Sequence, residues 1–447
     1  MIFQKLLDKL RNKHFLSLAG NGTMSALSMV TYAILYRLLP EADMGNWVFF
    51  QFIFALLDAA RTGFLQTALV KFYAGSTRPE KTAIAGSTWY LAAILTGVFA
   101  LLNLPLLLAR NSIADTGIQL FIHWYGLNFL FSLPFNVAFW LLQAEERFDR
   151  ILVLRIINQG SFIASLIVLF FLHQVNLQTV MYFYLACALC TSTISIFLGW
   201  AQLSNIRHKT LHHVKNLFHF GKFSVGTYIC SNLLRSSDSI IIKFMIGPAA
   251  LAVYNLAQRV GEVIELLIRS FLGTAMPAMA TAFNQQEEGK VVHIMKKYAG
   301  TLTLFLIPVT IGMFVFADVL VLFLGGGKYA NTEAATLLRI FMVLALTFPI
   351  DRFFGITLDI IHKPELNMIK VIFTLIINVV TDIIAIKITG NIYGAAVASF
   401  ITLIFGICFG YFTLRKYLPF NLNGVLKLGY EETKNMITTT LRKRPVL

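Results

Sequence analysis

The chain has 447 residues, of which 57% are hydrophobic and only 13% are charged. A soluble core cannot bury this much apolar side chain, so the composition excludes an ordinary water-soluble protein and predicts an integral membrane protein. The formal net charge of +15 would also suit a nucleic acid binder. However, the basic residues fall in alternate predicted loops. The positive-inside rule for membrane proteins already explains this pattern, so the net charge does not indicate nucleic acid binding.

Long apolar stretches with few charges predict where helices cross the membrane, because about 20 apolar residues span its hydrocarbon. We predict an all-α protein with about 12 transmembrane helices. In chain order they cover residues 15–38, 44–70, 83–108, 117–142, 151–172, 178–203, 219–246, 250–276, 295–322, 335–360, 366–388 and 392–414. The basic start of the chain resembles a secretory signal, but the apolar run is too long and lacks an A-x-A cleavage site, so we expect the first helix to be retained.

Lysine and arginine residues are distributed unevenly between the two predicted sides of the membrane. The N-terminal stretch, the even-numbered loops and the C-terminal stretch hold 25 of them, whereas the odd-numbered loops and their helix ends hold six. Because loops rich in lysine and arginine stay on the cytoplasmic side, this bias predicts that both termini are cytoplasmic.

The two halves of the chain contain a weak internal repeat. A shift of 207 positions places residues 44–69 on residues 251–276 without a gap. The identical pairs are Gln51 with Gln258, Phe64 with Phe271, Leu65 with Leu272, Thr67 with Thr274 and Ala68 with Ala275. Because the matched segment is the second helix of each half, we predict two pseudo-symmetric six-helix bundles in a parallel repeat, which in transporters bind substrate between the halves.

This repeat predicts how the chain divides. We expect an N-terminal six-helix lobe at residues 1–203, a basic cytoplasmic linker at 204–218 and a C-terminal six-helix lobe at 219–416. Residues 417–447 have the composition of a basic, partly amphipathic cytoplasmic tail.

Ionisable residues inside predicted spans are the functional candidates, since each costs at least about 2.5–3.5 kcal/mol to insert and normally faces a cavity or a partner. Arginine suits phosphate because its planar fork donates two parallel hydrogen bonds. The candidate substrate-binding cations are Arg61, Arg155, Arg235, Arg259, Arg269 and Arg352, and the candidate ion-coupling residues are Asp58, Asp238, Glu262 and Glu265. Alternatively, these residues form ion pairs that hold helices together, or long side chains that reach the interface.

Other motifs carry less weight. Cys187 and Cys190 form a C-x-x-C inside a predicted span, and His208 and His212 lie four residues apart in the linker, but neither has the companion ligands of a metal site. We therefore predict no metal centre. Gly325 to Lys328 is not a complete phosphate loop and is interpreted as a turn. Since the predicted outer loops are too short to carry catalytic groups, we expect no enzyme.

Several segments resemble the polysaccharide transporter family of O-antigen and oligosaccharide flippases. In the first half these are residues 36–47 (YRLLPEADMGNW) and 63–72 (GFLQTALVKF). In the second half they are residues 220–222 (FGK), 237–239 (SDS), 246–248 (IGP), 253–259 (VYNLAQR) and 275–277 (AMP). The resemblance covers about residues 15–416, but Pro40 stands where glycine is usual and Arg61 where an acidic residue is frequent.

The resemblance implies the exporter superfamily that also contains multidrug and toxin extrusion carriers. It implies a flippase that carries an undecaprenyl-pyrophosphate-linked oligosaccharide across the bacterial inner membrane by alternating access, for O-antigen or lipopolysaccharide synthesis. Partners would be this lipid-linked substrate, membrane lipids and other polysaccharide-assembly proteins, with Na⁺ or H⁺ coupling and no cofactor. The alternatives are a cation-coupled multidrug exporter of the same fold, a membrane enzyme of glycan assembly, and a lipid II flippase, a family that usually has two further helices.

Overall fold

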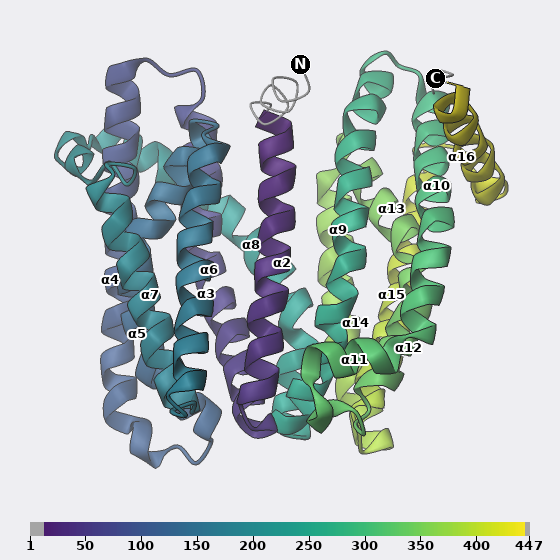
Figure 1. Cartoon of the computed structure of the whole chain (residues 1–447). Helices are drawn as coiled ribbons and strands as arrows, with labels where there is room; N and C mark the ends of the chain where they lie inside the picture. Colours follow the sequence, from purple (N-terminus) through teal and green to yellow (C-terminus); the bar gives the residue numbers. More distant parts are fainter. Residues whose placement is uncertain (1–12, 443–447) are drawn as a thin grey trace. The chain divides into compact units, whose positions relative to one another are not determined.

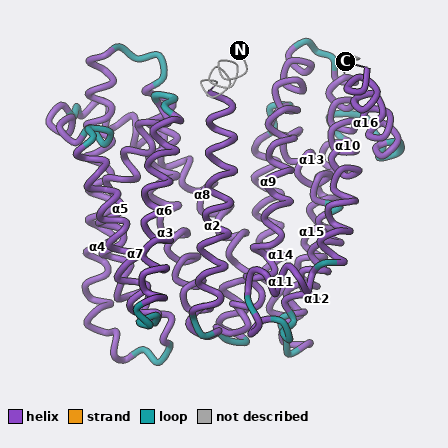
Figure 2. Tube along the Cα trace, in the orientation of Figure 1, coloured by secondary structure: helices purple, strands orange, loops and turns teal. Residues whose placement is uncertain are grey.

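A computed structural model describes residues 13–442, and its regular structure over this range is entirely helical (Figure 2). The chain forms two units. Unit 1 contains residues 1–236 and 247–252, and unit 2 contains residues 237–246 and 253–447. The boundary between the units therefore runs through the helices α8 (Leu211–Met245) and α9 (Pro248–Asn284).

Six long helices and two short 3-10 helices precede α8 in the described part of unit 1 (Figure 1). The long helices are α2 (Lys13–Leu38), α3 (Glu41–Tyr73), α4 (Arg78–Ala109), α5 (Thr116–Ala144), α6 (Phe148–Phe171) and α7 (Leu177–Phe197). The 3-10 helix η2 (Leu203–His208) leads into α8, and a shorter one, η1 (Arg110–Ser112), extends α4. Several starts are capped by side chains: Thr77 and Glu80 form a capping box at α4, and Asp115 accepts from the Ile118 N–H at α5.

Unit 2 continues from α9 with long helices that are interrupted twice: after α10 by shorter helices, and between α12 and α13 by a bend. Its elements are α10 (Glu288–Val315), α11 (Ala317–Gly325), η3 (Gly327–Tyr329), α12 (Ala334–Ala345), α13 (Phe348–Ile360), α14 (Pro364–Thr389), α15 (Tyr393–Arg415) and α16 (Val425–Arg442). Helices α14 and α15 form a hairpin, in which Gly394 packs against the backbone of Ile386. Gly390 begins this hairpin's turn with a φ of +67°, a conformation that glycine adopts at little cost.

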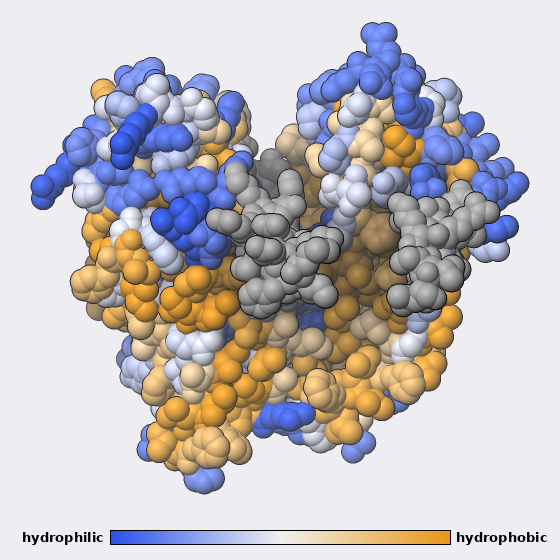
Figure 3. Space-filling view, turned by 45° about the horizontal axis from the view of Figure 1, so that its top comes forward, coloured by the Kyte–Doolittle hydropathy of each residue, from blue (hydrophilic) through white to orange (hydrophobic). Residues whose placement is uncertain are grey.

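Nine described helices are long and apolar enough to cross a membrane, and a tenth span is made by α12 and α13 together. Their outer surfaces carry large apolar side chains that are exposed in the isolated protein, such as Leu108, Phe171 and Ile388. Figure 3 shows hydrophobic residues covering the helices of each unit and hydrophilic residues gathered over the loops at one end. Lipid is the solvent that this surface requires, and the chain is a multi-pass integral membrane protein.

Unit 1 packs around α5, which contacts α3, α4, α6 and α7. An aromatic cluster joins α3, α6 and α7 near the beginning of α3: the ring of Trp47 stacks on Phe162 and meets Tyr184 edge to face. Gly45 lies so close to the chain at the start of α9 that an added Cβ would fall 1.7 Å from the carbonyl oxygen of Pro248. Glycine is therefore required where α3 meets this segment.

The twelve predicted spans fall in order on α2 through α10, the α12 and α13 pair, α14 and α15. Within the described residues, however, α2 and α8 are not among the helices that are long and apolar enough to cross a membrane, so the structure supports nine or ten spans rather than twelve. Several predicted boundaries were wrong, and three of them are informative. The span at 335–360 is bent by 49° between α12 and α13, where Pro349 lies in the first turn of α13 and supplies no backbone N–H. The span at 295–322 ends at Val315, and α11 begins as a separate helix. Most of the expected linker at 204–218 is helical, because α8 already begins at Leu211.

The repeat offset found in the sequence recurs in the helix starts. Helix α3 begins at Glu41 and α9 begins at Pro248, which are 207 residues apart. The same shift places Asp58 of α3 on Glu265 of α9. Each of these two acids forms ion pairs with arginine within its own unit. Helix α16, within the expected tail, packs on α10 through the close approach of Gly429 to Gly300.

Candidate functional site

The Arg61 side chain lies in the core of unit 1 and is fully buried. Its Nε and Nη2 donate to Asp58 Oδ1 at 3.0 and 2.5 Å. Its remaining N–H groups reach two other helices: Nη1 donates to Thr96 Oγ1 at 3.2 Å and to the Phe129 carbonyl at 3.0 Å, and Nη2 donates to Ser132 Oγ at 3.1 Å. The guanidinium also lies 4.7 Å from the centre of the Phe129 ring.

These contacts use all five N–H donors of the Arg61 guanidinium, which joins α3, α4 and α5. The carboxyl group of Asp58 is equally engaged, since Thr62 Oγ1 donates to Oδ2 at 3.1 Å. We expected Arg61 to line a substrate cavity and Asp58 to couple an ion. In this structure the buried Arg61 cation has every donor used and none left for a phosphate, so both roles stay predictions.

Unit 2 carries a stripe of charged residues along α9. Arg259 donates through Nη1 to Glu262 Oε1 at 2.8 Å. One and a half turns further on, Glu265 binds two arginines: Arg352 of α13 through Nη2 at 3.0 Å, and Arg269 at 4.0 Å from Nε. The two predicted arginines that are far apart in sequence, Arg269 and Arg352, therefore meet at one carboxylate.

The charged stripe lies in the middle of a helix that is apolar enough to span a membrane. The side chains of Glu262, Arg269 and Arg352 are nevertheless 57%, 61% and 50% exposed in the described structure. Three charges facing hydrocarbon would each cost about 2.5–3.5 kcal/mol or more, so this face of α9 and α13 must meet water or a polar ligand. The stripe is the best candidate for contact with a charged substrate.

A second site in unit 2 contains two carboxyl groups, Asp238 near the end of α8 and Asp382 in α14. The side chain of Asp382 is fully buried and faces that of Asp238. Asp238 Oδ2 accepts from Tyr254 Oη at 2.7 Å and from Ser399 Oγ at 3.4 Å. In contrast, Asp238 Oδ1 and both carboxyl oxygens of Asp382 are buried and make no hydrogen bond.

Four helices, α8, α9, α14 and α15, bring this acid pair and its neighbours together. One turn before Asp382, the Asn378 side chain accepts from Ser237 Oγ at 2.6 Å and presents a further amide beside the pair. Two ionised carboxylates repel one another strongly in a buried site, so they can share it only with a cation or a proton between them. The site has the chemistry of a small-cation or proton site.

The remaining predicted residues lie outside these clusters. Arg155 of α6 is half-buried with its guanidinium 4.9 Å from the centre of the Phe139 ring, and Arg235 is exposed on the part of α8 that belongs to unit 1. Asp351 of α13 binds the buried Lys370 of α14. This last pair ties two helices together within unit 2.

Sequence reasoning missed the role of Asp382, Tyr254 and Ser399. Asp382 had one available signal, because it is a carboxylate without a basic residue within four positions in an apolar helix. Nothing in the sequence connects it with Asp238, which lies 144 residues earlier, or with the hydroxyl groups of Tyr254 and Ser399. These partners become visible only when four helices pack.

Comparison with known proteins agrees with this architecture. Residues 10–283 match the family described as polysaccharide biosynthesis protein, and residues 224–384 match the family described as MatE. Among curated proteins, the chain is similar to one from Haloferax volcanii described as a probable low-salt glycan biosynthesis flippase, Agl15, with 22% identity over 207 residues. That match covers 46% of this chain and 43% of the relative, so it spans less than half of either protein.

Solved structures are similar over most of the chain. A structure of the lipid II flippase MurJ in an inward closed conformation has a TM-score of 0.75 at 14% identity, covering 96% of this chain and 93% of that one. An inward-facing multidrug resistance transporter of the MATE family, in the MOP superfamily, has a TM-score of 0.70 at 17% identity, covering 88% and 95%. A MOP superfamily transporter from Pyrococcus furiosus has a TM-score of 0.60 at 18% identity, covering 92% and 94%. The predicted fold class, an all-α integral membrane protein of this exporter-type fold, is therefore confirmed over most of the chain.

Proposed function

Because the chain belongs to the polysaccharide biosynthesis protein family, we propose that it is a flippase that moves a lipid-linked oligosaccharide across a membrane. The observation that carries the proposal is the exposed charged stripe of α9 and α13 in unit 2, at Glu262, Glu265, Arg269 and Arg352. Charged residues in the middle of a span normally face a water-filled cavity and mark a substrate or ion pathway. The curated relative, described as a glycan biosynthesis flippase, supports the same class of substrate.

The stripe suits a phosphate-bearing headgroup for a chemical reason. Glu265 holds Arg269 and Arg352 near one another, and their side chains are 61% and 50% exposed. A diphosphate can accept parallel hydrogen bonds from the two forks at once, whereas the carboxylate keeps the arginines in position. In our proposal the headgroup is the pyrophosphate of an undecaprenyl-linked oligosaccharide, the setting is the bacterial inner membrane with both termini cytoplasmic, and the product serves surface polysaccharides such as O-antigen.

We further propose that the acid pair couples transport to an ion gradient by alternating access. Asp238 and Asp382 would hold one Na⁺ or one proton, and its release would leave two buried negative charges that the unit must rearrange to separate. Among the four coupling residues that we predicted, only Asp238 faces a second carboxyl group, since Asp58, Glu262 and Glu265 are bound by arginines.

Flipping in proteoliposomes tests the substrate proposal. Wild type is compared with Arg269→Gln, Arg352→Gln and the double variant, using a radiolabelled undecaprenyl-pyrophosphate oligosaccharide. Each single variant should lose about 10- to 150-fold in rate, because one charge-assisted hydrogen bond contributes about 1.5–3 kcal/mol. The matched control is Arg339→Gln, which removes an arginine bound to Asp318 at 2.5 Å between α11 and α12. If the double variant flips the lipid at the same rate as wild type, the charged-stripe mechanism is wrong.

The coupling proposal is tested separately with imposed Na⁺ and pH gradients. Asp382→Asn should abolish the response of transport to the gradient while downhill flipping persists, and Asp318→Asn should leave the response intact. A gradient response that survives in Asp238→Asn and Asp382→Asn alike would rule out the acid pair.

The second candidate is a cation-coupled multidrug exporter, favoured by the match of residues 224–384 to the MatE family and by the acid pair. The same proteoliposomes distinguish the two. Export of cationic dyes against Na⁺ or H⁺, with no flipping of the lipid-linked oligosaccharide, would replace the flippase proposal.

A further inference from the structure

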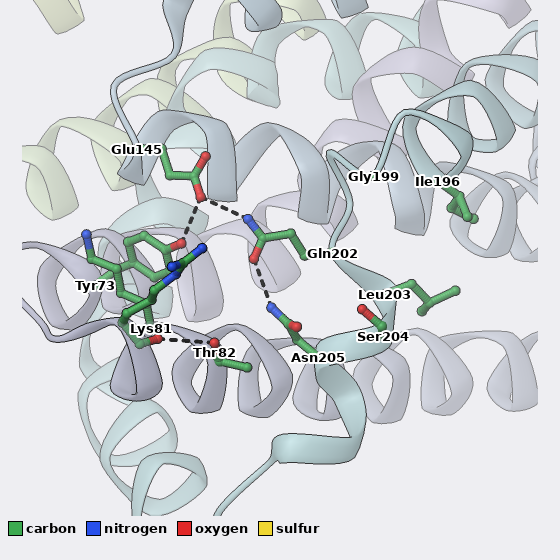
Figure 4. Close-up of a pocket in the computed structure, with 11 residues that line it drawn as sticks. Tyr73, Lys81, Thr82, Glu145, Ile196, Gly199, Gln202, Leu203, Ser204 and Asn205 are labelled. Atoms are coloured by element: carbon green, nitrogen blue, oxygen red, sulfur yellow. Dashed lines mark hydrogen bonds between the residues drawn. The ribbon is translucent and has the colours of Figure 1, made fainter.

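A polar cavity of about 750 Å³ lies at the loop end of unit 1, where the α3–α4, α5–α6 and α7–α8 connections meet (Figure 4). It is distinct from the charged stripe and the acid pair, which belong to unit 2. Its lining residues are Tyr73, Arg78, Lys81, Thr82, Glu145, Ile196, Gly199, Gln202, Leu203, Ser204 and Asn205. By the distribution of basic residues, these three connections belong to the predicted cytoplasmic side.

A chain of hydrogen bonds connects Tyr73, Glu145, Gln202 and Asn205, which together form the floor of the cavity. The Tyr73 hydroxyl and the Gln202 side-chain amide both donate to Glu145 Oε1, each at 2.8 Å, and Asn205 Nδ2 donates to Gln202 Oε1 at 2.9 Å. Figure 4 shows Tyr73, Glu145 and Gln202 meeting from three separate segments of the chain, with Asn205 beside Gln202. Since both donors use Oε1, these hydrogen bonds leave the Oε2 atom of Glu145 open to a ligand.

Gln202 occupies a strained backbone position in this floor. Its φ is +49°, in the left-handed region, which costs a residue other than glycine about 1–2 kcal/mol. The neighbouring chain is fixed at Ala201, whose carbonyl accepts from Trp89 Nε1 at 2.6 Å. Such strain persists where surrounding contacts over-determine the conformation, and it is concentrated at binding sites.

The charges of the lining residues are arranged for a ligand with two charges of opposite sign. Arg78 and Lys81 lie three residues apart at the start of α4 and supply two cations. Glu145 is the one carboxylate among the lining residues, and the nearby Glu80 is bound instead to Thr77 in the helix cap, at 2.8 Å. A phosphate fits beside Arg78 and Lys81, and an ammonium group fits at Glu145.

The cavity also has an apolar edge. In Figure 4, Tyr73 and Lys81 lie at one end of the site, and Ile196 and Leu203 lie at the other. The residues after Ile196 continue toward lipid, since the side chains of Phe197 and Leu198 are 85% and 50% exposed at the end of α7. An acyl chain can therefore leave the cavity along α7, while a soluble ligand would gain nothing from this edge.

We propose that this cavity binds the headgroup of a phospholipid that carries both a phosphate and a primary ammonium, namely phosphatidylethanolamine. Arg78 and Lys81 bind the phosphate, Glu145 Oε2 accepts from the ammonium, and the acyl chains lie against Ile196 and the exposed end of α7. The bound lipid fills the site where three connections of unit 1 meet, and it anchors this end of the unit in one leaflet.

Lipid binding to the full chain can be measured by native mass spectrometry in detergent. The probes are phosphatidylethanolamine, phosphatidylglycerol, which lacks the amine, and phosphatidylcholine, whose amine cannot donate. We expect wild type to retain phosphatidylethanolamine about tenfold more strongly than either, because the ammonium adds a charge-assisted hydrogen bond. Glu145→Gln should abolish this preference, while its amide oxygen still accepts from Tyr73 and Gln202 and preserves the fold.

Two further arms make the result decisive. Arg78→Gln with Lys81→Gln should weaken all three lipids, whereas Lys215→Gln, an exposed lysine of α8 outside the cavity, should change nothing. Glycerophosphoethanolamine, the headgroup without acyl chains, should compete only weakly. The proposal fails if Glu145→Gln keeps the preference, if the double variant binds all lipids like wild type, or if the soluble headgroup competes as well as the lipid.

Discussion

Replacing Arg61 by methionine should destabilise unit 1 strongly, because it removes five N–H donors from the core while keeping a long side chain. Removing one partner of a buried ion pair costs about 3–5 kcal/mol. Asp58 remains 22% exposed, which lets water screen its charge and favours the lower end of this range. The Phe129 carbonyl and the Thr96 and Ser132 hydroxyls also lose their donor. We therefore expect a loss of about 3–4 kcal/mol in the free energy of unfolding.

This loss can be measured as a melting temperature in detergent, followed by fluorescence-detected size-exclusion chromatography. For a folding unit of roughly 150–250 residues, each kcal/mol shifts the melting temperature by about 2–4 °C, so Arg61→Met should melt on the order of 10 °C below wild type. Arg155→Met is the matched control in the same unit. Its half-buried guanidinium lies over the Phe139 ring, a contact of about 1 kcal/mol, so a drop of only a few degrees is expected.

The double variant with Asp58→Ala and Arg61→Met should recover part of the lost stability. It removes the Asp58 carboxylate, which Arg61→Met alone leaves without its cation. The reasoning is refuted if Arg61→Met melts no lower than Arg155→Met. A different result would restore our initial interpretation of Arg61 as a substrate contact: full stability of Arg61→Met together with a loss of affinity for the lipid-linked oligosaccharide.

Two further predictions concern glycines at close helix contacts. Gly45→Ala should cost about 1–3 kcal/mol of stability, because the added Cβ would lie 1.7 Å from the Pro248 carbonyl oxygen. Thermal unfolding checks this, and Gly97→Ala, where nothing lies within 4 Å of the added Cβ, should melt like wild type. Gly300→Ala should detach α16 from α10, since its Cβ would lie 2.0 Å from the Val425 carbonyl oxygen. Hydrogen exchange across residues 425–434 should then accelerate; unchanged exchange would show that α16 does not depend on this contact.

The fold class and the order of the helices could be predicted because they depend on local properties of the chain. A stretch of about 20 apolar residues must form a helix in lipid, whichever helices surround it, since its backbone has no other hydrogen-bond partners there. The family was likewise recognisable from short motifs, and residues 10–283 confirm it. Boundaries were less predictable: the bend before α13 and the early start of α8 depend on packing and on single residues such as Pro349.

The sequence by itself determined which residues are charged inside the membrane, and it drew attention to the arginines and carboxylates of α3, α9 and α13. Only the tertiary structure decided their roles. Arg61 and Arg269 are equally plausible substrate contacts in the sequence, yet one has every donor bound within a core and the other is 61% exposed. Likewise, Asp382 becomes a candidate cation or proton site only because it faces Asp238, which lies 144 residues away in the sequence. The reason is physical: insertion cost belongs to each residue alone, whereas burial, hydrogen-bond satisfaction and charge repulsion depend on neighbours that distant helices supply.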